Sequence, residues 1–233
     1  MSTKEIFDAF AEKYDGWYIR HRELYVSELK AASSFNCRGG LEIGIGTGRF
    51  AGPLGLRAGV DPSTAMLKLA RGDLDLVAGV GERLPFREKA FPCALIVVTL
   101  CFADNPLDLM REAARVAERV VVCIVPRDSP WGVKYRREAS AGHPFYSRAR
   151  FYTVAEAVGF GEAAGLDLVS ISATLKDLDE REQPVAAPDL REAEGYGFVC
   201  IELTRRRQID GGPYGVVDGV EGRRGGEPSA HIG

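Results

Sequence analysis

The sequence lacks the features that mark membrane and secreted proteins. None of its apolar runs approaches the ~20 residues that a bilayer-spanning helix needs. The first 14 residues are charged and helix-like, without the apolar stretch or the small-residue cleavage site of a signal peptide. From these absences we expect a soluble, cytoplasmic protein with no membrane partner.

Support for metal and nucleic-acid partners is also missing. The chain of 233 residues has three histidines, none of them at metal-ligand spacing from a cysteine, so we predict no metal site. Positive charge is not in excess, because the formal net charge is −3. Binding to a phosphate backbone requires a basic face, and we therefore expect no nucleic-acid partner.

The cysteines show no paired spacing, and three of them lie in or beside apolar, strand-like runs. Free cysteine is among the most frequently buried residue types. The pattern therefore favours buried free thiols over disulfides. The five residues are Cys37, Cys93, Cys101, Cys123 and Cys200.

A regular alternation of apolar strand-like runs and helical segments is present instead. The predicted strands are residues 41–43, 56–61, 74–78, 94–100, 120–125, 166–174 and 198–204. The predicted helices between them are a short one after residue 48, then 63–71, a segment opened by Pro106, and 154–164. Nearly continuous apolar strands that alternate with helices are typical of a mostly parallel sheet covered on both faces. We predict one α/β domain with a doubly wound sheet.

Three segments depart from this alternation. Residues 2–18 form a predicted amphipathic helix with a capping box made by Ser2 and Glu5. Residues 126–152 contain six aromatic residues and little periodicity, so this segment either covers something or is covered. Residues 208–233 contain eight glycines and few apolar anchors, which predicts a disordered tail.

The strongest motif is the segment LEIGIGTGRF at residues 41–50, in which glycines alternate directly behind the first strand. Glycine lets the backbone turn sharply and approach a ligand closely. A dinucleotide fingerprint would place its third glycine at position 49, where the chain has Arg49. The spacing therefore favours a nucleoside without a pyrophosphate.

Two carboxylates accompany this motif. Asp61 ends the second strand, 17 residues beyond Gly44, where it could accept hydrogen bonds from both hydroxyls of a ribose. Alternatively, it only caps the helix that follows. Glu42 lies within an apolar strand and needs a partner, because burial of an unpaired charge is costly. A cationic ligand could supply that partner, directly or through water.

With further motifs, these residues resemble class I, Rossmann-like S-adenosylmethionine-dependent methyltransferases of the small-molecule and ubiquinone-biosynthesis type. The resemblance spans residues 7–204. Its carrying segments are Phe7-Asp8, Tyr14-Asp15-x-Trp17 and residues 41–50, 59–63, 79–86 and 100–106. It implies a seven-stranded sheet with an antiparallel last strand. It also implies a helical lid at 1–36 and a donor-binding domain at 37–207 with an aromatic cap at 126–152.

The resemblance further implies S-adenosylmethionine as methyl donor and S-adenosylhomocysteine as product. Glu42 and the glycine backbone would face the methionine part of the donor, and Asp61 would hold its ribose. Gly81 and Glu82 would border the adenine, and Leu100 would lie near the sulfonium. The full implied donor-binding set is Glu42, Gly44, Gly46, Gly48, Asp61, Pro62, Gly81, Glu82 and Leu100.

The chain departs from the family pattern at two places. Val80 stands where relatives often have an acid that accepts from the adenine amino group. Cys101 and Phe102 stand where many relatives have histidines, so a familiar candidate base is missing. Methyl transfer depends mainly on proximity and orientation in a dry pocket, and a general base is not essential to it.

Candidate bases are nevertheless present on segments that could reach the ends of the central strands. They are Tyr14, Tyr18, His21 and His143. The aromatic residues of the first helix and of residues 126–152 could form the walls of an acceptor pocket, where ring faces would also favour a cation. Alternatively, they form a second hydrophobic cluster. Net charge and the lack of an appended recognition domain favour a small-molecule acceptor.

Two other functions remain open from the sequence alone. A nicotinamide-dependent oxidoreductase shares the fold and the acidic residue after the second strand, although the glycine spacing and the lack of a hydride-transfer arrangement count against it. A non-catalytic module that binds S-adenosylmethionine is also compatible, because Val80 differs from the pattern and the base residues are missing. The oligomeric state is not predicted.

Overall fold

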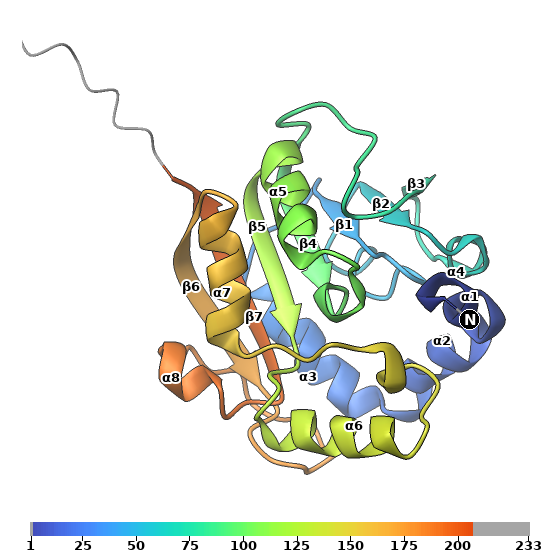
Figure 1. The fold of residues 1–233 in the computed structure, drawn as a ribbon, viewed down its shortest axis with the longest axis vertical. Coiled ribbons are helices and arrows are strands. Elements are labelled where there is room, and N and C mark those ends of the chain that lie inside the picture. The colour runs from blue at the N-terminus through green and yellow to red at the C-terminus, as the bar shows by residue number, and fades with distance from the viewer. Residues whose placement is uncertain (1, 207–233) are drawn as a thin grey trace, which may run out of the picture.

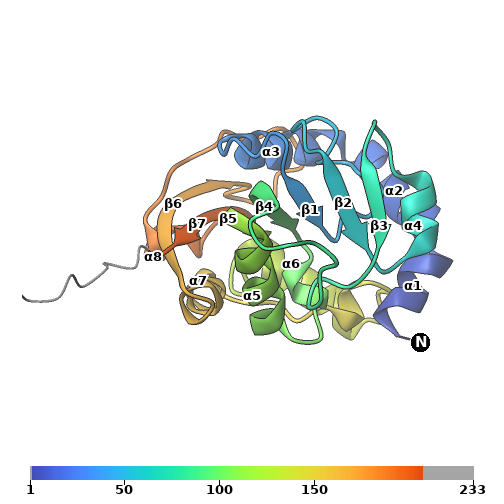
Figure 2. The same cartoon turned by 90° about the horizontal axis from the view of Figure 1, so that it is seen from above.

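The computed structural model describes residues 2–206, so the predicted tail at 208–233 lies outside the described residues. A seven-stranded sheet forms its centre, with helices on both faces (Figures 1 and 2). The strand order is β3-β2-β1-β4-β5-β7-β6, and β7 runs antiparallel to both of its neighbours. The strands are β1 (Leu41–Ile43), β2 (Ala58–Asp61), β3 (Asp75–Ala78), β4 (Phe91–Val97), β5 (Ala117–Ile124), β6 (Leu166–Thr174) and β7 (Phe198–Arg205). The predicted α/β class and the antiparallel last strand are confirmed.

The glycine turn after β1 lies where the strand order reverses. Strand β1 pairs in parallel with β2 on one side and with β4 on the other, so that Leu41 lies opposite both Ala58 and Ala94. In open α/β sheets, the loops that leave the two central strands diverge at such a point and leave a crevice beyond their carboxyl ends. The glycine turn after β1 and the loop after β4 border this crevice.

Helices cover both faces of the sheet. Figure 2 shows α3 over one face and α5 and α7 over the other. Helix α6 crosses the carboxyl end of the sheet (Figure 1). Within residues 2–206 no helix is long and apolar enough to cross a membrane. The helices are α1 (Thr3–Ala9), α2 (Ala11–Arg20), α3 (Arg22–Ser33), α4 (Thr64–Leu69), α5 (Pro106–Val116), α6 (Pro130–Ser140), α7 (Val154–Ala163) and α8 (Leu190–Ala193).

The amino-terminal region differs from its prediction. The capping box of Ser2 and Glu5 is confirmed, but the single helix predicted for residues 2–18 is divided at Phe10 into α1 and α2. The two pieces have different anchors: Asp8 of α1 accepts a hydrogen bond from Ser63 Oγ, and Asp15 of α2 pairs with Arg49. Tertiary contacts therefore override the local periodicity. The short helix predicted after residue 48 is a series of turns.

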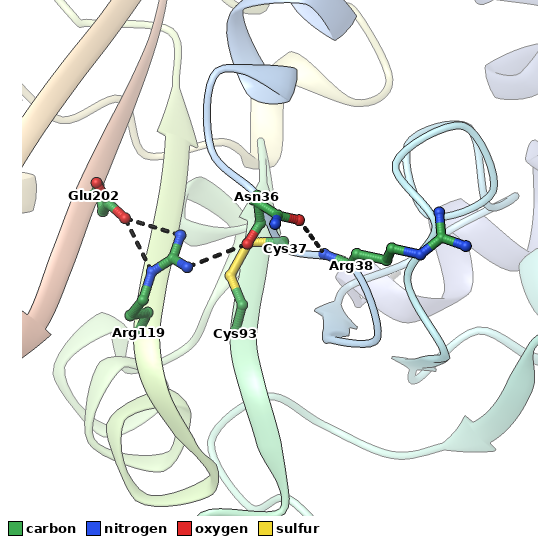
Figure 3. The surroundings of a disulfide bond; sticks show 6 residues. All are labelled: Asn36, Cys37, Arg38, Cys93, Arg119 and Glu202. Carbon is green, nitrogen blue, oxygen red and sulfur yellow. Dashed lines mark hydrogen bonds and ion pairs between the residues drawn. A yellow bond between two sulfur atoms is a disulfide. The ribbon is translucent and has the colours of Figure 1, made fainter.

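The prediction of free thiols is wrong for four of the five cysteines. Cys123 and Cys200 lie opposite each other on β5 and β7 and form a disulfide. Cys37 precedes β1 and is bonded to Cys93 at the start of β4, beside Arg119 (Figure 3). The partners are 77 and 56 residues apart in sequence, so only the order of the strands brings them together. Cys101 is free.

Candidate active site

A cavity of about 260 Å³ opens at the carboxyl ends of β1, β2 and β4. Helices α1 and α2 close one side of it, and the loops after β3 and β4 close the other. Six of the nine residues in the implied donor-binding set line it, and the other three lie behind its wall. The six are Gly44, Gly46, Asp61, Pro62, Gly81 and Glu82.

The three glycines of the turn all have positive φ angles, of 74°, 55° and 73°, but their surroundings differ. A Cβ on Gly44 would lie 2.2 Å from Thr99 Oγ1, so this position tolerates no side chain. A Cβ on Gly46 would meet only the Tyr14 ring, at 3.9 Å. At Gly48 it would touch the backbone of Arg71, outside the cavity. Only Gly46 therefore offers open backbone to a ligand.

Asp61 holds the glycine turn in place from the end of β2. One carboxylate oxygen accepts the Gly46 N–H at 2.9 Å, and the other accepts the Ser63 N–H at 2.8 Å. Helix α4 is capped by Ser63 itself, through its side chain, so Asp61 is not its N-cap. Burial raises the pKa of Asp61 above its ordinary value, although these two N–H groups act in the opposite direction. Each oxygen keeps capacity for a second hydrogen bond from the cavity side.

Three residues of the implied set do not reach the cavity surface. Glu42 is 2% exposed, and its Oε2 has no hydrogen-bond partner among the described residues. Burial raises its pKa well above the ordinary value. Leu100 is completely buried in the turn after β4, and Gly48 packs behind the glycine turn. These three residues would act on a ligand only through the residues that line the cavity.

The loop after β3 forms the opposite rim. Gly81 is held between two side chains, because a Cβ there would lie 2.9 Å from both Ile43 and Leu109. Glu82 accepts the Asp104 N–H at 2.9 Å and so joins this rim to the loop after β4. Val80 lines the same rim and is 46% exposed, where it presents an apolar side chain in place of an acid.

An ion pair joins α2 to the glycine turn. Asp15 is 7% exposed and accepts hydrogen bonds from Thr47 Oγ1 and from Arg49 Nε, both at 2.7 Å. Arg71 donates to its other oxygen at 2.8 Å. Burial raises the pKa of Asp15, but the bonds from Arg49 and Thr47 outweigh this effect and the pKa is lowered overall. The sequence motif Tyr14-Asp15-x-Trp17 therefore includes a structural anchor.

A second cavity of about 120 Å³ lies beside the first. Its walls are aromatic rings from α2 and from the segment 126–152, which the sequence analysis singled out as two separate groups. Tyr14 and Tyr18 face it from α2, and their hydroxyl groups lie 3.1 Å apart. The other aromatic walls are Trp17, Phe102, Tyr135, Phe145, Tyr146 and Phe151. Tyr14, Val98 and Phe102 line both cavities.

The candidate bases are placed unequally around this second cavity. Tyr14 and Tyr18 line it, and burial raises the pKa of both hydroxyls. His143 also lines it, and burial lowers its pKa. His21 lines neither cavity: its ring stacks on Trp17, and its Nδ1 lies 3.0 Å from the Trp17 carbonyl oxygen. The thiol of Cys101 has its pKa raised by burial to about 12, which disfavours a nucleophilic thiolate.

The sequence analysis missed Glu28, which lines the second cavity from α3. It is 8% exposed, and burial raises its pKa from 4.5 to about 8. A signal for it was present in the sequence: Glu28 interrupts the apolar series Leu24, Ala31 and Phe35, which recurs at helical spacing. A carboxylate on the buried face of a helix is as unusual as Glu42 within the apolar strand β1, which the sequence did single out.

Comparisons with known proteins identify the family of the chain. Residues 41–125 match the family model described as methyltransferase domain. The chain is 34% identical to a solved S-adenosylmethionine-dependent methyltransferase of Thermotoga maritima, named as a possible histamine N-methyltransferase. That match covers 88% of this chain and 100% of the other, with a TM-score of 0.80.

One further relative and one protein of similar fold extend these comparisons. An uncharacterised protein of Methanocaldococcus jannaschii is 35% identical over 209 residues, which are 86% of this chain and 98% of that protein. The fold is also similar to magnesium protoporphyrin IX methyltransferase from Synechocystis PCC 6803, solved with bound S-adenosylhomocysteine. There the identity is 14%, the coverage 87% of this chain and 98% of the other, and the TM-score 0.59. This last similarity concerns the fold alone.

Proposed function

Because the chain belongs to the class I S-adenosylmethionine-dependent methyltransferases, we propose that its first cavity binds the donor and its second binds a small-molecule acceptor. One observation carries this assignment: Tyr14, Val98 and Phe102 line both cavities. Ligands in the two cavities would therefore lie next to each other, as in-line transfer requires. Family membership favours this enzyme over the nicotinamide-dependent oxidoreductase and the non-catalytic module.

In this proposal, Asp61 accepts hydrogen bonds from the ribose hydroxyls, and the open backbone at Gly46 lets the donor lie close to the turn. Pro62, Gly81 and Glu82 border the adenine from the rim. Glu42 fits the same ligand from behind the turn, because its buried Oε2 lacks a partner among the described residues and a positive charge beyond the turn would offset its burial. Gly48 and Leu100 support the wall.

The donor supplies a methyl group on a positively charged sulfur, and the protein supplies orientation and exclusion of water. We propose that α1–α3, within residues 1–36, act as a lid over the domain 37–207. The segment 126–152 would act as a cap, since it contributes rings to the second cavity. The volume of that cavity, about 120 Å³, supports a small-molecule acceptor.

Calorimetry with S-adenosylhomocysteine tests the donor site. We expect Asp61→Ala to weaken binding by ~1–3 kcal/mol, the range for hydrogen bonds that involve a charged group. Asp73→Ala is the matched control, because Asp73 is exposed and does not line the cavity. Unchanged affinity in Asp61→Ala would remove this residue from the site. Tight binding of a nicotinamide dinucleotide in place of S-adenosylhomocysteine would contradict the whole assignment.

A further inference from the structure

Glu28 is a buried acid without a partner. It is 8% exposed and, within residues 2–206, its side chain forms no hydrogen bond or ion pair. Burial of a carboxylate costs several kcal/mol unless it is paired or protonated. A buried acid whose side chain makes no bond within the protein, at the wall of a cavity, points to a ligand that pairs with it.

Aromatic residues from three elements face this acid. Tyr14 and Tyr18 of α2, Tyr135 of α6 and Tyr146 of the short helical turn after it all have their pKa raised, first by burial and in part by the charge of Glu28. Helix α6 lies across the carboxyl end of the sheet (Figure 1) and brings this wall opposite α2 and α3. The cavity therefore combines one potential negative charge with several ring faces, and both attract cations.

No positive side chain of the cavity pairs with this acid. Lys13 and Arg20 line the cavity but are exposed, and neither forms an ion pair with a described residue. Lys13 instead lies over the Phe10 ring, with its Nζ 5.8 Å from the centroid. The other titratable groups on the walls are the Cys101 thiol and His143, and His143 Nδ1 lies 3.3 Å from the Tyr146 backbone nitrogen. A cationic ligand would therefore supply the positive charge that an ionised Glu28 lacks.

We propose that the methyl acceptor is a small amine, bound as its ammonium by the Glu28 carboxylate inside the aromatic walls, and that Glu28 takes the proton that the nitrogen must lose. This inference rests on the proposed function, because it assumes that the second cavity is the acceptor site. An anionic acceptor or a neutral alcohol would leave Glu28 protonated and would form no ion pair with it.

The step balances as follows. The ammonium passes one proton to Glu28, and the nitrogen lone pair that this frees forms a bond to the methyl carbon. The carbon–sulfur bond breaks and its electron pair stays on sulfur. One ammonium and one methyl sulfonium thus give one methylammonium, one thioether and one proton. That proton leaves from Glu28 to solvent when the product departs.

Binding in the presence of S-adenosylhomocysteine tests the proposal without turnover. The probes are benzylamine, cyclohexylamine and histamine, compared with benzyl alcohol and benzoate. We expect at least one amine to bind the wild-type protein more than tenfold tighter than both non-amines. Glu28→Gln should lose that preference. Glu23→Gln should keep it, since Glu23 lies on the same helix, is half-exposed and does not line the cavity.

Proton release gives a second readout. Free Glu28 has a pKa of about 8, so it is mostly protonated at pH 7 and must release its proton to solvent when an ammonium binds. Calorimetry in two buffers of different ionisation enthalpy should give close to one proton released per amine bound by the wild-type protein. Glu28→Gln should release none through this site, and Glu23→Gln, which does not change the cavity wall, should behave like the wild type. Release that persists in Glu28→Gln but is lost in His143→Gln would transfer the role to that histidine and overturn the proposal.

Failure of this inference can be separated from failure of the proposed function. If S-adenosylhomocysteine does not bind, the donor assignment is wrong. If it binds but every amine fails to bind, or binds Glu28→Gln as tightly as the wild type, the donor assignment stands and the amine proposal is overturned. Transfer of methyl groups to benzyl alcohol or benzoate in preference to the amines would have the same consequence.

Discussion

Replacing Glu28 with glutamine should change how the stability of the free protein depends on pH. The carboxyl group has a pKa near 4.5 when it is solvated and about 8 in the folded protein. Between these values the folded state binds more protons than the unfolded state, so the free energy of unfolding falls as pH rises. The loss begins above pH 4.5 and is complete above the folded pKa. Glutamine does not titrate, so the variant avoids this loss.

The size of the effect follows from the width of that window. Each pH unit within it is worth about 1.4 kcal/mol. We therefore expect the free energy of unfolding of Glu28→Gln, relative to the wild type, to rise by about 2 kcal/mol between pH 6 and pH 8. Solvent screening reduces this free-energy difference only slightly, because Glu28 is 8% exposed. Any cost of burying the glutamine amide is independent of pH and cancels from the slope.

Urea unfolding of ligand-free protein at pH 6, 7 and 8 measures this slope directly. Titration of other groups affects both proteins and is removed by taking the difference between them. Glu23→Gln is the control and should give a difference that does not change with pH. If the wild-type and Glu28→Gln proteins keep a constant difference across this range, Glu28 is reached by solvent or paired in the folded state, and the reasoning is refuted.

Three other predictions address the donor site, the lid and the cysteines. Gly46→Ala should lower the affinity for S-adenosylhomocysteine at least tenfold in calorimetry, because the added Cβ would point into the cavity. Gly142→Ala is the control, since Gly142 also has a positive φ but a Cβ there would have no neighbouring atom within 4 Å. An equal loss of affinity in Gly142→Ala would attribute the effect to backbone strain. Asp15→Asn should lower the free energy of unfolding at pH 7 by ~1–3 kcal/mol, since Arg49 loses its anion. The lowered pKa of Asp15 means that this difference should vanish as the pH falls through that value, and urea unfolding at pH 7 and in acid checks both points. Denatured, unreduced protein should take up iodoacetamide at Cys101 alone, as measured by mass spectrometry, and labelling of further cysteines before reduction would contradict the disulfides.

Strands could be read from the sequence because their signal is local. The predicted first strand and the strand at 166–174 agree with β1 and β6 at both ends. Each begins directly after a glycine, Gly40 or Gly165, and glycine is a strong local signal for the end of a turn. The strand predicted at 94–100 begins earlier, at Phe91, and ends at Val97. Beyond it the chain turns so that Thr99 can pack against Gly44, a contact between distant segments that periodicity does not contain.

The parts that the sequence did not predict depend on tertiary contacts. Helix α3 mixes polar and apolar residues, and its apolar series from Leu24 to Phe35 shows which face is buried but not what that face packs against. Helix α6 was hidden in the aromatic segment 126–152, although Ser129 caps it and Pro130 opens it. The aromatic residues themselves were recognised as two groups. That they face one another around Glu28 follows from the crossing of α6 over the sheet, which no spacing along the chain expresses.

The division between donor and acceptor residues also runs along the chain. The match to the methyltransferase family covers residues 41–125, and every cavity residue that we assign to the donor, from Gly44 to Glu82, lies within it. Glu28 on α3, Tyr135 on α6 and Tyr146 after it, which we assign to the amine, lie outside it. Tyr14 joins the two sets, since it lines both cavities, and the neighbouring Asp15 ties its helix to the glycine turn. Within the matched region, only Val98, Cys101, Phe102 and Val125 also line the second cavity. Most of the acceptor wall can therefore vary through α1–α3 and residues 126–152 while the donor site stays unchanged.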